Sequence, residues 1–79
     1  MPPEPLVFYA IYEHPRDYPH SFVARRWRLV DGAKEPDRLP LVVGPTLEAV
    51  REVLHCSAFG LTRLERDPYD DPVIVEVWI

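Results

Sequence analysis

Residues 14–20 read His-Pro-Arg-Asp-Tyr-Pro-His and form the densest group of chemically reactive side chains in this 79-residue chain. His14 and His20 could ligate a metal ion or carry protons, because imidazole titrates near neutral pH. Asp17 could orient one imidazole, and Arg16 could bind an anion. The structural alternative is a loop stiffened by two prolines, in which Arg16 pairs with Asp17 and both histidines are solvated.

A zinc site would need three or four side-chain ligands, which this loop does not supply by itself. The remaining candidates, His55 and Cys56, are adjacent in a predicted helix and therefore point about 100° apart. Cys56 is the only cysteine, so the chain forms no internal disulfide, which favours a reducing compartment. It also lies near the C-terminal end of the helix, where the helix dipole disfavours a thiolate. We therefore expect no metal, no cofactor and no cysteine nucleophile.

Arg25, Arg26, Trp27 and Arg28 form a basic run around an aromatic ring. In a strand, Arg26 and Arg28 share one face, and Arg25 and Trp27 share the other. Cations beside a stacking ring suit single-stranded RNA or DNA, so a nucleic-acid-binding or antitoxin-like regulator is one alternative function. The competing interpretation is that the arginines cover the sheet and pair with acids such as Glu76. The net charge of −4 disfavours a globally basic nucleic-acid binder.

Three carboxylates, Asp67, Asp70 and Asp71, lie within five residues. A calcium loop would need alternating oxygen ligands and a glycine at the turn, whereas residues 66–72 contain two prolines and no glycine. Aspartates that accept hydrogen bonds from the local backbone of a turn account for this composition.

A small-molecule or anion site between the two proline-bounded loops is a third possible function. Its candidate side chains are His14, Arg16 and His20 on one loop, and Asp70 and Asp71 on the other. The sequence contains no Ser-His-Asp order and no paired-carboxylate motif, and three glycines are too few for a phosphate-cradling loop. An enzyme is therefore not favoured.

Proline is the compositional outlier, with 10 of 79 residues against a usual share of about 5%. Since proline is excluded from helix interiors and central strands, regular elements are expected in the intervals between prolines. Asp31 and Gly32 indicate a turn, followed by a polar stretch through Arg38. The predicted strands span residues 6–13, 21–30, 39–43, 59–65 and 73–79.

The spacing of apolar residues predicts one helix over residues 47–56, with Thr46 as its N-cap. The residues expected to pack on the sheet are Leu47, Val50, Val53 and Leu54. Those expected on the solvent side are Glu48, Arg51, Glu52 and His55. The predicted fold class is α+β: an antiparallel sheet of four to five strands with one helix on one face, in the order β-β-(β)-α-β-β.

A helix of about ten residues spans roughly 15 Å and cannot cover both faces of such a sheet. In the last strand, Val73, Val75, Val77 and Ile79 are expected on one face, and Ile74, Glu76 and Trp78 on the other. The residues expected on the face without the helix are Trp78, Ile74 and some of Tyr9, Ile11, Phe22 and Trp27. An exposed apolar face usually marks an interface, which predicts a homodimer with stacked faces or paired edge strands. The alternative is that the N-terminus and residues 31–38 fold over this face.

Composition and length predict a single domain over residues 1–79, with residues 1–5 as a loosely packed lead. Hydrophobic residues at 47% and charged residues at 28% fit a globular domain rather than a disordered tail or a coiled coil. No apolar stretch approaches the roughly 20 residues of a membrane span, and no signal peptide is evident, so we expect a cytoplasmic protein. The favoured function is a homodimeric protein-interaction or adaptor module without catalysis.

The patterns HPRDxP at residues 14–19, FVxRxW at 22–27 and DDPVIVEVW at 70–78 resemble a group of small bacterial proteins of similar length. No activity is attached to that group, so the resemblance implies no function. The order of strands and helix is also similar in architecture to the partial RNase-H-like antitoxins of the HicB type. The HicB glycine motif has no counterpart in this sequence.

Overall fold

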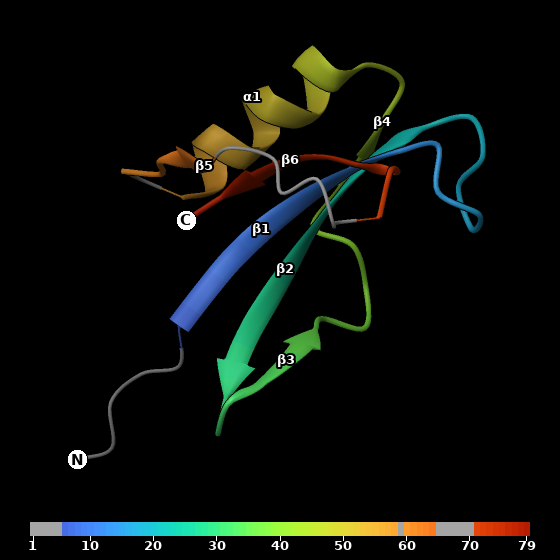
Figure 1. Ribbon diagram of the computed structural model, residues 1–79. Helices are drawn as coiled ribbons and strands as arrows, with labels where there is room; N and C mark the ends of the chain where they lie inside the picture. The colour runs from blue at the N-terminus through green and yellow to red at the C-terminus, as the bar shows by residue number, and fades with distance from the viewer. Residues whose placement is uncertain (1–5, 59, 65–70) are drawn as a thin grey trace.

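The computed structural model describes residues 6–58, 60–64 and 71–79, which form one antiparallel sheet of six strands and one helix (Figure 1). The α+β class and the single helix on one face of the sheet are confirmed for these residues. The sheet has more strands than the four to five expected, and its spatial order is β3-β2-β1-β6-β5, with β4 also paired to β2. In the described residues no helix is both long and apolar enough to cross a membrane.

The centre of the sheet is the long hairpin of β1 (Leu6–Glu13) and β2 (Phe22–Val30). The two strands pair without interruption from Leu6 opposite Leu29 to Glu13 opposite Phe22. Both are rich in β-branched and aromatic residues, which suit a pleated surface. This register settles which side chains share each face, because directly opposite residues project to the same side.

Two short strands, β3 (Ala33–Pro36) and β4 (Val42–Gly44), pair with the same edge of β2. β3 was not predicted, because residues 33–36 belong to the stretch through Arg38 that was described only as polar. Asp31 and Gly32 have φ values of 50° and 80°, as in a tight hairpin turn, which returns the chain along β2 although all four β3 residues are exposed.

The segment between β3 and β4 bulges out of the sheet, and this shortens the strand expected over residues 39–43. Trp27 lies opposite Pro36 and Ala24 lies opposite Val42, so two residues of β2 face five residues of the partner. Only Asp37 and Leu41 keep backbone hydrogen bonds to β2, each through its N–H group. We call residues 37–41 the edge bulge.

The other edge of the sheet is formed by β6 (Ile74–Trp78) and the two-residue strand β5 (Arg63–Leu64). β5 is shorter than the strand expected over residues 59–65, whose end positions lie outside the described residues. The pairing of β6 with β1 shifts between Ile11 and Tyr12, because Val75 is an extra residue on β6. The predicted strict alternation along residues 73–79 is therefore wrong.

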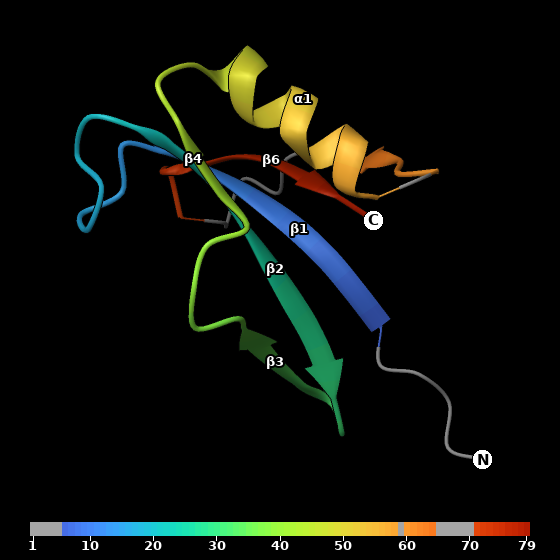
Figure 2. The same ribbon diagram turned by 180° about the vertical axis from the view of Figure 1, so that it is seen from behind.

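Helix α1 (Leu47–Ser57) confirms the predicted helix to within one residue at its C-terminal end. Its N-cap is Thr46, whose Oγ1 accepts a hydrogen bond from the N–H of Ala49 at 3.1 Å. Val50 and Leu54 are fully buried against Ile11 and Ala24 of the sheet. Figure 2 shows α1 on one side of the sheet, over the end where β1 meets β6.

Three helix positions differ from the predicted pattern. Val53 was expected to pack on the sheet but is 41% exposed. Arg51 and His55 were expected on the solvent side, yet both contact β6: Arg51 donates hydrogen bonds to Glu76, and the His55 ring packs on Trp78. The reason is that β6 brings a carboxylate and a large aromatic ring under this side of the helix.

Candidate functional site

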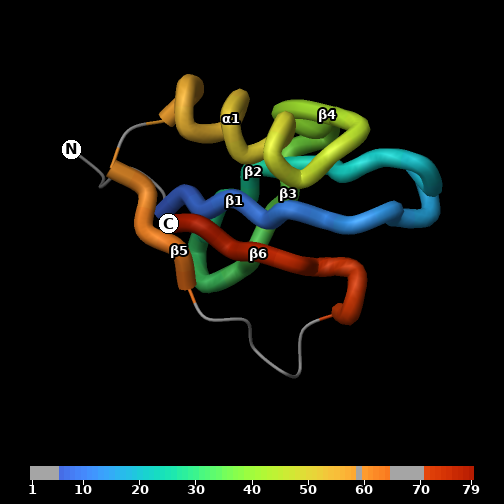
Figure 3. Tube along the Cα trace, turned by 90° about the horizontal axis from the view of Figure 1, so that it is seen from above, coloured from blue at the N-terminus to red at the C-terminus, as the bar shows by residue number. Residues whose placement is uncertain are grey.

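The sheet face opposite α1 carries a continuous set of apolar and aromatic side chains, which we call the open face. The register places on it Leu6, Phe8, Tyr12, Val23, Trp27, Leu29, Val43, Leu64 and Val77. Among the described residues no helix or strand covers this face, and Figure 3 shows α1 on the other side of β1 and β6. Leu6 is 51% exposed and Leu64 is 42% exposed, and they share this face with the other apolar side chains in one contiguous surface.

Three aromatic residues form the centre of the open face. The Phe8 and Trp27 rings stack, with 6.0 Å between their centroids and 8° between their planes. Trp27 Nε1 donates a hydrogen bond to Tyr12 Oη at 3.0 Å, so the indole extends along the sheet from Phe8 towards the loop end. Ala10 lies between Phe8 and Tyr12 on the same face and is only 2% exposed.

The Tyr12 phenol is a hydrogen-bond donor at neutral pH. Burial raises the pKa of Tyr12 above its usual value, although the hydrogen bond from Trp27 and the nearby positive charge of Arg25 act in the opposite direction. Since Trp27 occupies one lone pair of the phenol oxygen, the O–H group remains available to a further acceptor.

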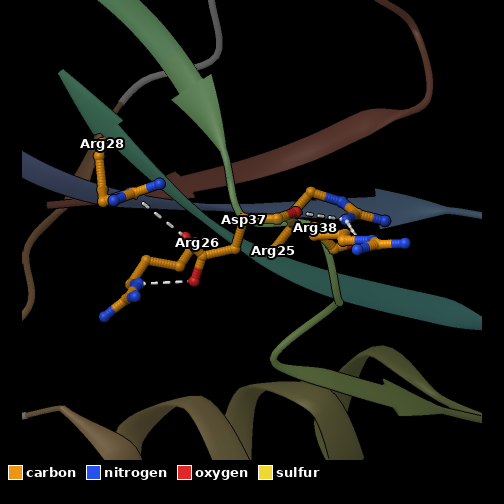
Figure 4. Close-up of polar contacts among 5 residues, drawn as sticks. All are labelled: Arg25, Arg26, Arg28, Asp37 and Arg38. Carbon is orange, nitrogen blue, oxygen red and sulfur yellow. Dashed lines mark hydrogen bonds and ion pairs between the residues drawn. The ribbon is translucent and has the colours of Figure 1, made fainter. Parts of the chain in front are cut away.

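The register confirms that Arg26 and Arg28 share the helix-side face of β2, away from Trp27. Both pair with Asp37 at the start of the edge bulge: Arg26 Nε donates to Asp37 Oδ2 at 2.8 Å, and Arg28 Nε lies 3.4 Å from Oδ1 (Figure 4). Asp37 was missed by the sequence reasoning because only the bulge brings it beside β2.

Arg25 is on the open face but is held against the chain. Its Nη1 donates to the carbonyl oxygens of Asp37 at 2.7 Å and Arg38 at 3.2 Å (Figure 4), and its Nη2 lies 3.6 Å from Asp17 Oδ2. The Arg25 side chain is only 18% exposed. The expected pairing between Arg16 and Asp17 is thus replaced by a link from Asp17 to Arg25, which joins the 14–20 loop to the edge bulge.

Glu76 does not pair with the arginines of β2, contrary to the competing interpretation of that run. Its side chain is 1% exposed and accepts hydrogen bonds from Arg51, with Nε at 3.1 Å, and from Trp78 Nε1 at 2.9 Å. Arg63 Nη2 lies 3.7 Å away. A buried carboxylate requires such partners, and this cluster ties α1, β5 and β6 together.

Trp78 therefore lies on the helix side of the sheet, not on the face without the helix as expected. Tyr9 and Trp78 are directly opposite, and the His55 ring packs edge-on against Trp78 with 4.7 Å between centroids. Tyr9, Phe22 and Trp78 all pack around the core of Ile11, Ala24, Val50 and Leu54. Of the large side chains expected on the uncovered face, Ile74, opposite Tyr12, and Trp27 are on it, whereas Trp78 is not. Of the further candidates, Tyr9, Ile11 and Phe22 are on the helix side.

The two histidines of the 14–20 loop do not form a shared site in the structure. His14 has a φ of 47°, and its ring packs against Phe22 on the helix side, with 5.3 Å between centroids. His20 is exposed. The loop is held by backbone hydrogen bonds, including His14 N–H to the Ser21 carbonyl at 2.9 Å.

A pocket of about 510 Å³ does lie between the 14–20 loop and the segment that leads into β6. We call it the loop pocket. Its lining residues are Tyr12, Pro15, Arg16, Asp17, Val23, Arg25, Asp71 and Val73. Three residues of the expected loop site, Arg16, Asp17 and Asp71, are thus brought together, whereas neither His14 nor His20 lines the pocket. Asp67 and Asp70 lie outside the described residues.

No group of three or more His, Cys, Asp or Glu side chains within the described ranges is arranged to hold a metal ion. Comparison with family models, with curated proteins and with solved structures gives no match to this chain. The resemblances noted from the sequence patterns therefore stay predictions.

Proposed function

We propose that this protein is a non-catalytic interaction module that forms a homodimer through its open face. The observation that supports this most directly is the set of aromatic and aliphatic side chains that β1, β2, β5 and β6 place on this face, all but buried Ala10 and Val23 being exposed or half-buried. Contiguous apolar surface of this kind usually marks a site of protein association.

The distribution of charge supports association by this face. Along β1, β2, β5 and β6, the charged side chains Glu13, Arg26, Arg28, Arg63 and Glu76 all share the helix side. Arg25 is the exception, and it is already bonded to Asp17 and to two carbonyl groups. On the edge strand β3, exposed Lys34 lies opposite Leu29 and adds one positive charge at the margin of this face. Interface centres are depleted in charge, so the open face has the composition expected of one.

A second copy of the chain is the occupant that best fits this face, because two identical faces have the same size and can stack about a two-fold axis. Strands of eight and nine residues span about 26–30 Å, and four paired strands about 19 Å. Two such faces stacked about a two-fold axis would bury roughly 1,000 Å² in total, the lower end for a specific interface. We therefore expect a dimer of micromolar rather than nanomolar affinity.

Sedimentation velocity over a concentration series from about 1 to about 500 μM tests the dimer, with Leu6→Lys as the disrupting variant. Leu6 is 51% exposed at the end of the open face, so a lysine there adds charge to the interface without removing core packing. The wild type should shift from monomer to dimer, and Leu6→Lys should weaken dimerisation at least about tenfold.

Leu39→Lys is the matched control, because Leu39 is 75% exposed and lies in the edge bulge, outside the open face. It should dimerise as the wild type does. A wild type that stays monomeric throughout the series, or a Leu6→Lys variant that dimerises like Leu39→Lys, would reject the proposal.

The nucleic-acid alternative has less support from the contacts. Arg26 and Arg28 project from the face opposite Trp27, and all three guanidinium groups of the run have acidic or carbonyl partners. Single-strand binding would instead need free cations beside the stacking ring. Binding of a fluorescent oligonucleotide at low salt that is lost in Trp27→Ala would restore that alternative.

A further inference from the structure

The loop pocket at the end of the open face combines an apolar floor with a polar rim. Pro15 and Val23 are buried, and together with half-buried Val73 they form the apolar part. Small-molecule sites commonly have this composition, with a few polar groups converging over an apolar surface.

The positive charge available in the pocket belongs to Arg16. Arg25 is occupied by the carbonyl groups of Asp37 and Arg38 and by Asp17, so the Arg25 and Asp17 charges compensate each other. Arg16 is exposed and forms no ion pair with the part of the chain that the structure describes. The described residues thus leave the donors of its guanidinium group free for a carboxylate or another anion.

The negative charge available in the pocket belongs to Asp71, across from the loop that bears Arg16. Asp71 Oδ1 accepts a hydrogen bond from the N–H of Val73 at 3.1 Å, which holds the side chain in a turn before β6. Within the described residues no cation pairs with Asp71. Tyr12 adds a neutral donor, because its oxygen accepts from Trp27 and its proton is unused by the described chain.

We propose that the loop pocket binds a small zwitterion of the α-amino-acid class with an apolar side chain. Arg16 and the Tyr12 hydroxyl bind the carboxylate, Asp71 binds the ammonium group, and the side chain packs on Val23 and Val73. A simple anion would face the Asp71 charge without compensation, whereas a zwitterion matches both unpaired charges. The pocket shares Tyr12 and Val23 with the open face, but Leu6 lies at the opposite end of β1, so Leu6→Lys offers the pocket without the dimer.

The experiment is an NMR titration of ¹⁵N-labelled protein with leucine, valine and phenylalanine. Two probes report on the pocket: the Trp27 indole N–H, which is bonded to Tyr12, and the Val73 amide, which is bonded to Asp71. Trp27→Phe identifies the indole peak, because the chain has two tryptophans. Saturable shifts of both probes are expected with at least one amino acid.

Two analogues of the bound amino acid test the carboxylate and the ammonium group of the ligand separately. For leucine these are leucinamide, which lacks the carboxylate, and 4-methylpentanoate, which lacks the ammonium group. Since a charge-assisted hydrogen bond is lost in each, we expect roughly tenfold weaker binding of either analogue.

Variants assign each charge to its residue. Arg16→Gln should bind leucine and leucinamide equally, and Asp71→Asn should bind leucine and 4-methylpentanoate equally. Arg38→Gln and Glu52→Gln remove exposed charges outside the pocket and should leave every affinity unchanged. The dispersion of the amide spectrum checks that each variant is folded.

Absence of a saturable shift with all three amino acids would overturn the site. Discrimination between leucine and its analogues that survives in Arg16→Gln and Asp71→Asn would overturn the assignment of the charges. Leu6→Lys should bind the amino acid as the wild type does, so a failure of the dimer and a failure of the pocket are separately visible.

Discussion

At the scale of single residues, Glu76 shows how one buried charge organises its surroundings. Its carboxylate is the one buried charged group among the described residues, and it draws in Arg51 from α1 and the Trp78 indole from its own strand. A carboxylate away from water is stable only when paired and hydrogen-bonded. This requirement explains why Arg51, on the expected solvent side of the helix, turns towards the sheet.

We expect Arg51→Ala to destabilise the protein by about 2 kcal/mol, because it leaves Glu76 buried with only the more distant Arg63 as a cation. Urea unfolding followed by circular dichroism measures the change. Arg38→Ala, at an exposed arginine of the edge bulge, is the control and should change stability by less than about 0.5 kcal/mol. Equal stabilities for the two variants would show that the pair is not structural.

At the scale of elements, the short strand β4 and helix α1 are linked by a close approach at Gly44. A Cβ atom built on Gly44 would lie 3.1 Å from Val50 Cγ2, closer than an ordinary van der Waals contact. Gly44 therefore lets the chain turn from the sheet edge into α1 without pushing the helix away from Ile11 and Ala24.

We expect Gly44→Ala to cost about 1–2 kcal/mol of stability through this contact. Val50→Ala removes the facing methyl groups, so the double variant should be more stable than the sum of the two single losses predicts. A double-mutant cycle from chemical denaturation measures the coupling. Strict additivity would mean that the cost of Gly44→Ala comes from another source.

The elements also show what patterns along a chain can predict. β1, β2, β6 and α1 were predictable because their apolar periodicity and capping signals are local and each extends over at least five residues. β3 was not predictable from the sequence, because its four exposed residues carry no periodic signal. They pair with β2 because the Asp31-Gly32 turn places them beside it. The bulge on β6 was also hidden, and it places Ile74 and Trp78 on opposite faces of the sheet, where strict alternation would put them on one.

At the scale of the whole molecule, the chain has one helix among its described residues and two sheet faces to cover. The helix side has a buried core, whereas the other side has aromatic residues stacked along the sheet surface. Small domains have little core to stabilise them, so association through the second face would contribute to folding stability.

We expect the apparent Tm of the wild type to rise with protein concentration, because a dimer that dissociates on unfolding is stabilised by mass action. Over a hundredfold range of concentration the rise should be several degrees, and it should be smaller in Leu6→Lys, whose dimer is weaker. Calorimetry with Leu39→Lys as the control measures the shift. A Tm that is independent of concentration in the wild type would contradict a dimer coupled to folding.

The sequence by itself determined the fold class, the helix, the long strands and the separation of Arg26 and Arg28 from Trp27, because these depend on local periodicity. It also placed Arg16, Asp17 and Asp71 on the two loops that border the pocket. Only the tertiary structure decided that Trp78 is half-buried on the helix side, that Asp37 holds two arginines, and that Tyr12 and Arg25 complete the pocket. Those outcomes depend on two bulges and on pairings between distant segments, which a register shift of a single residue would reverse.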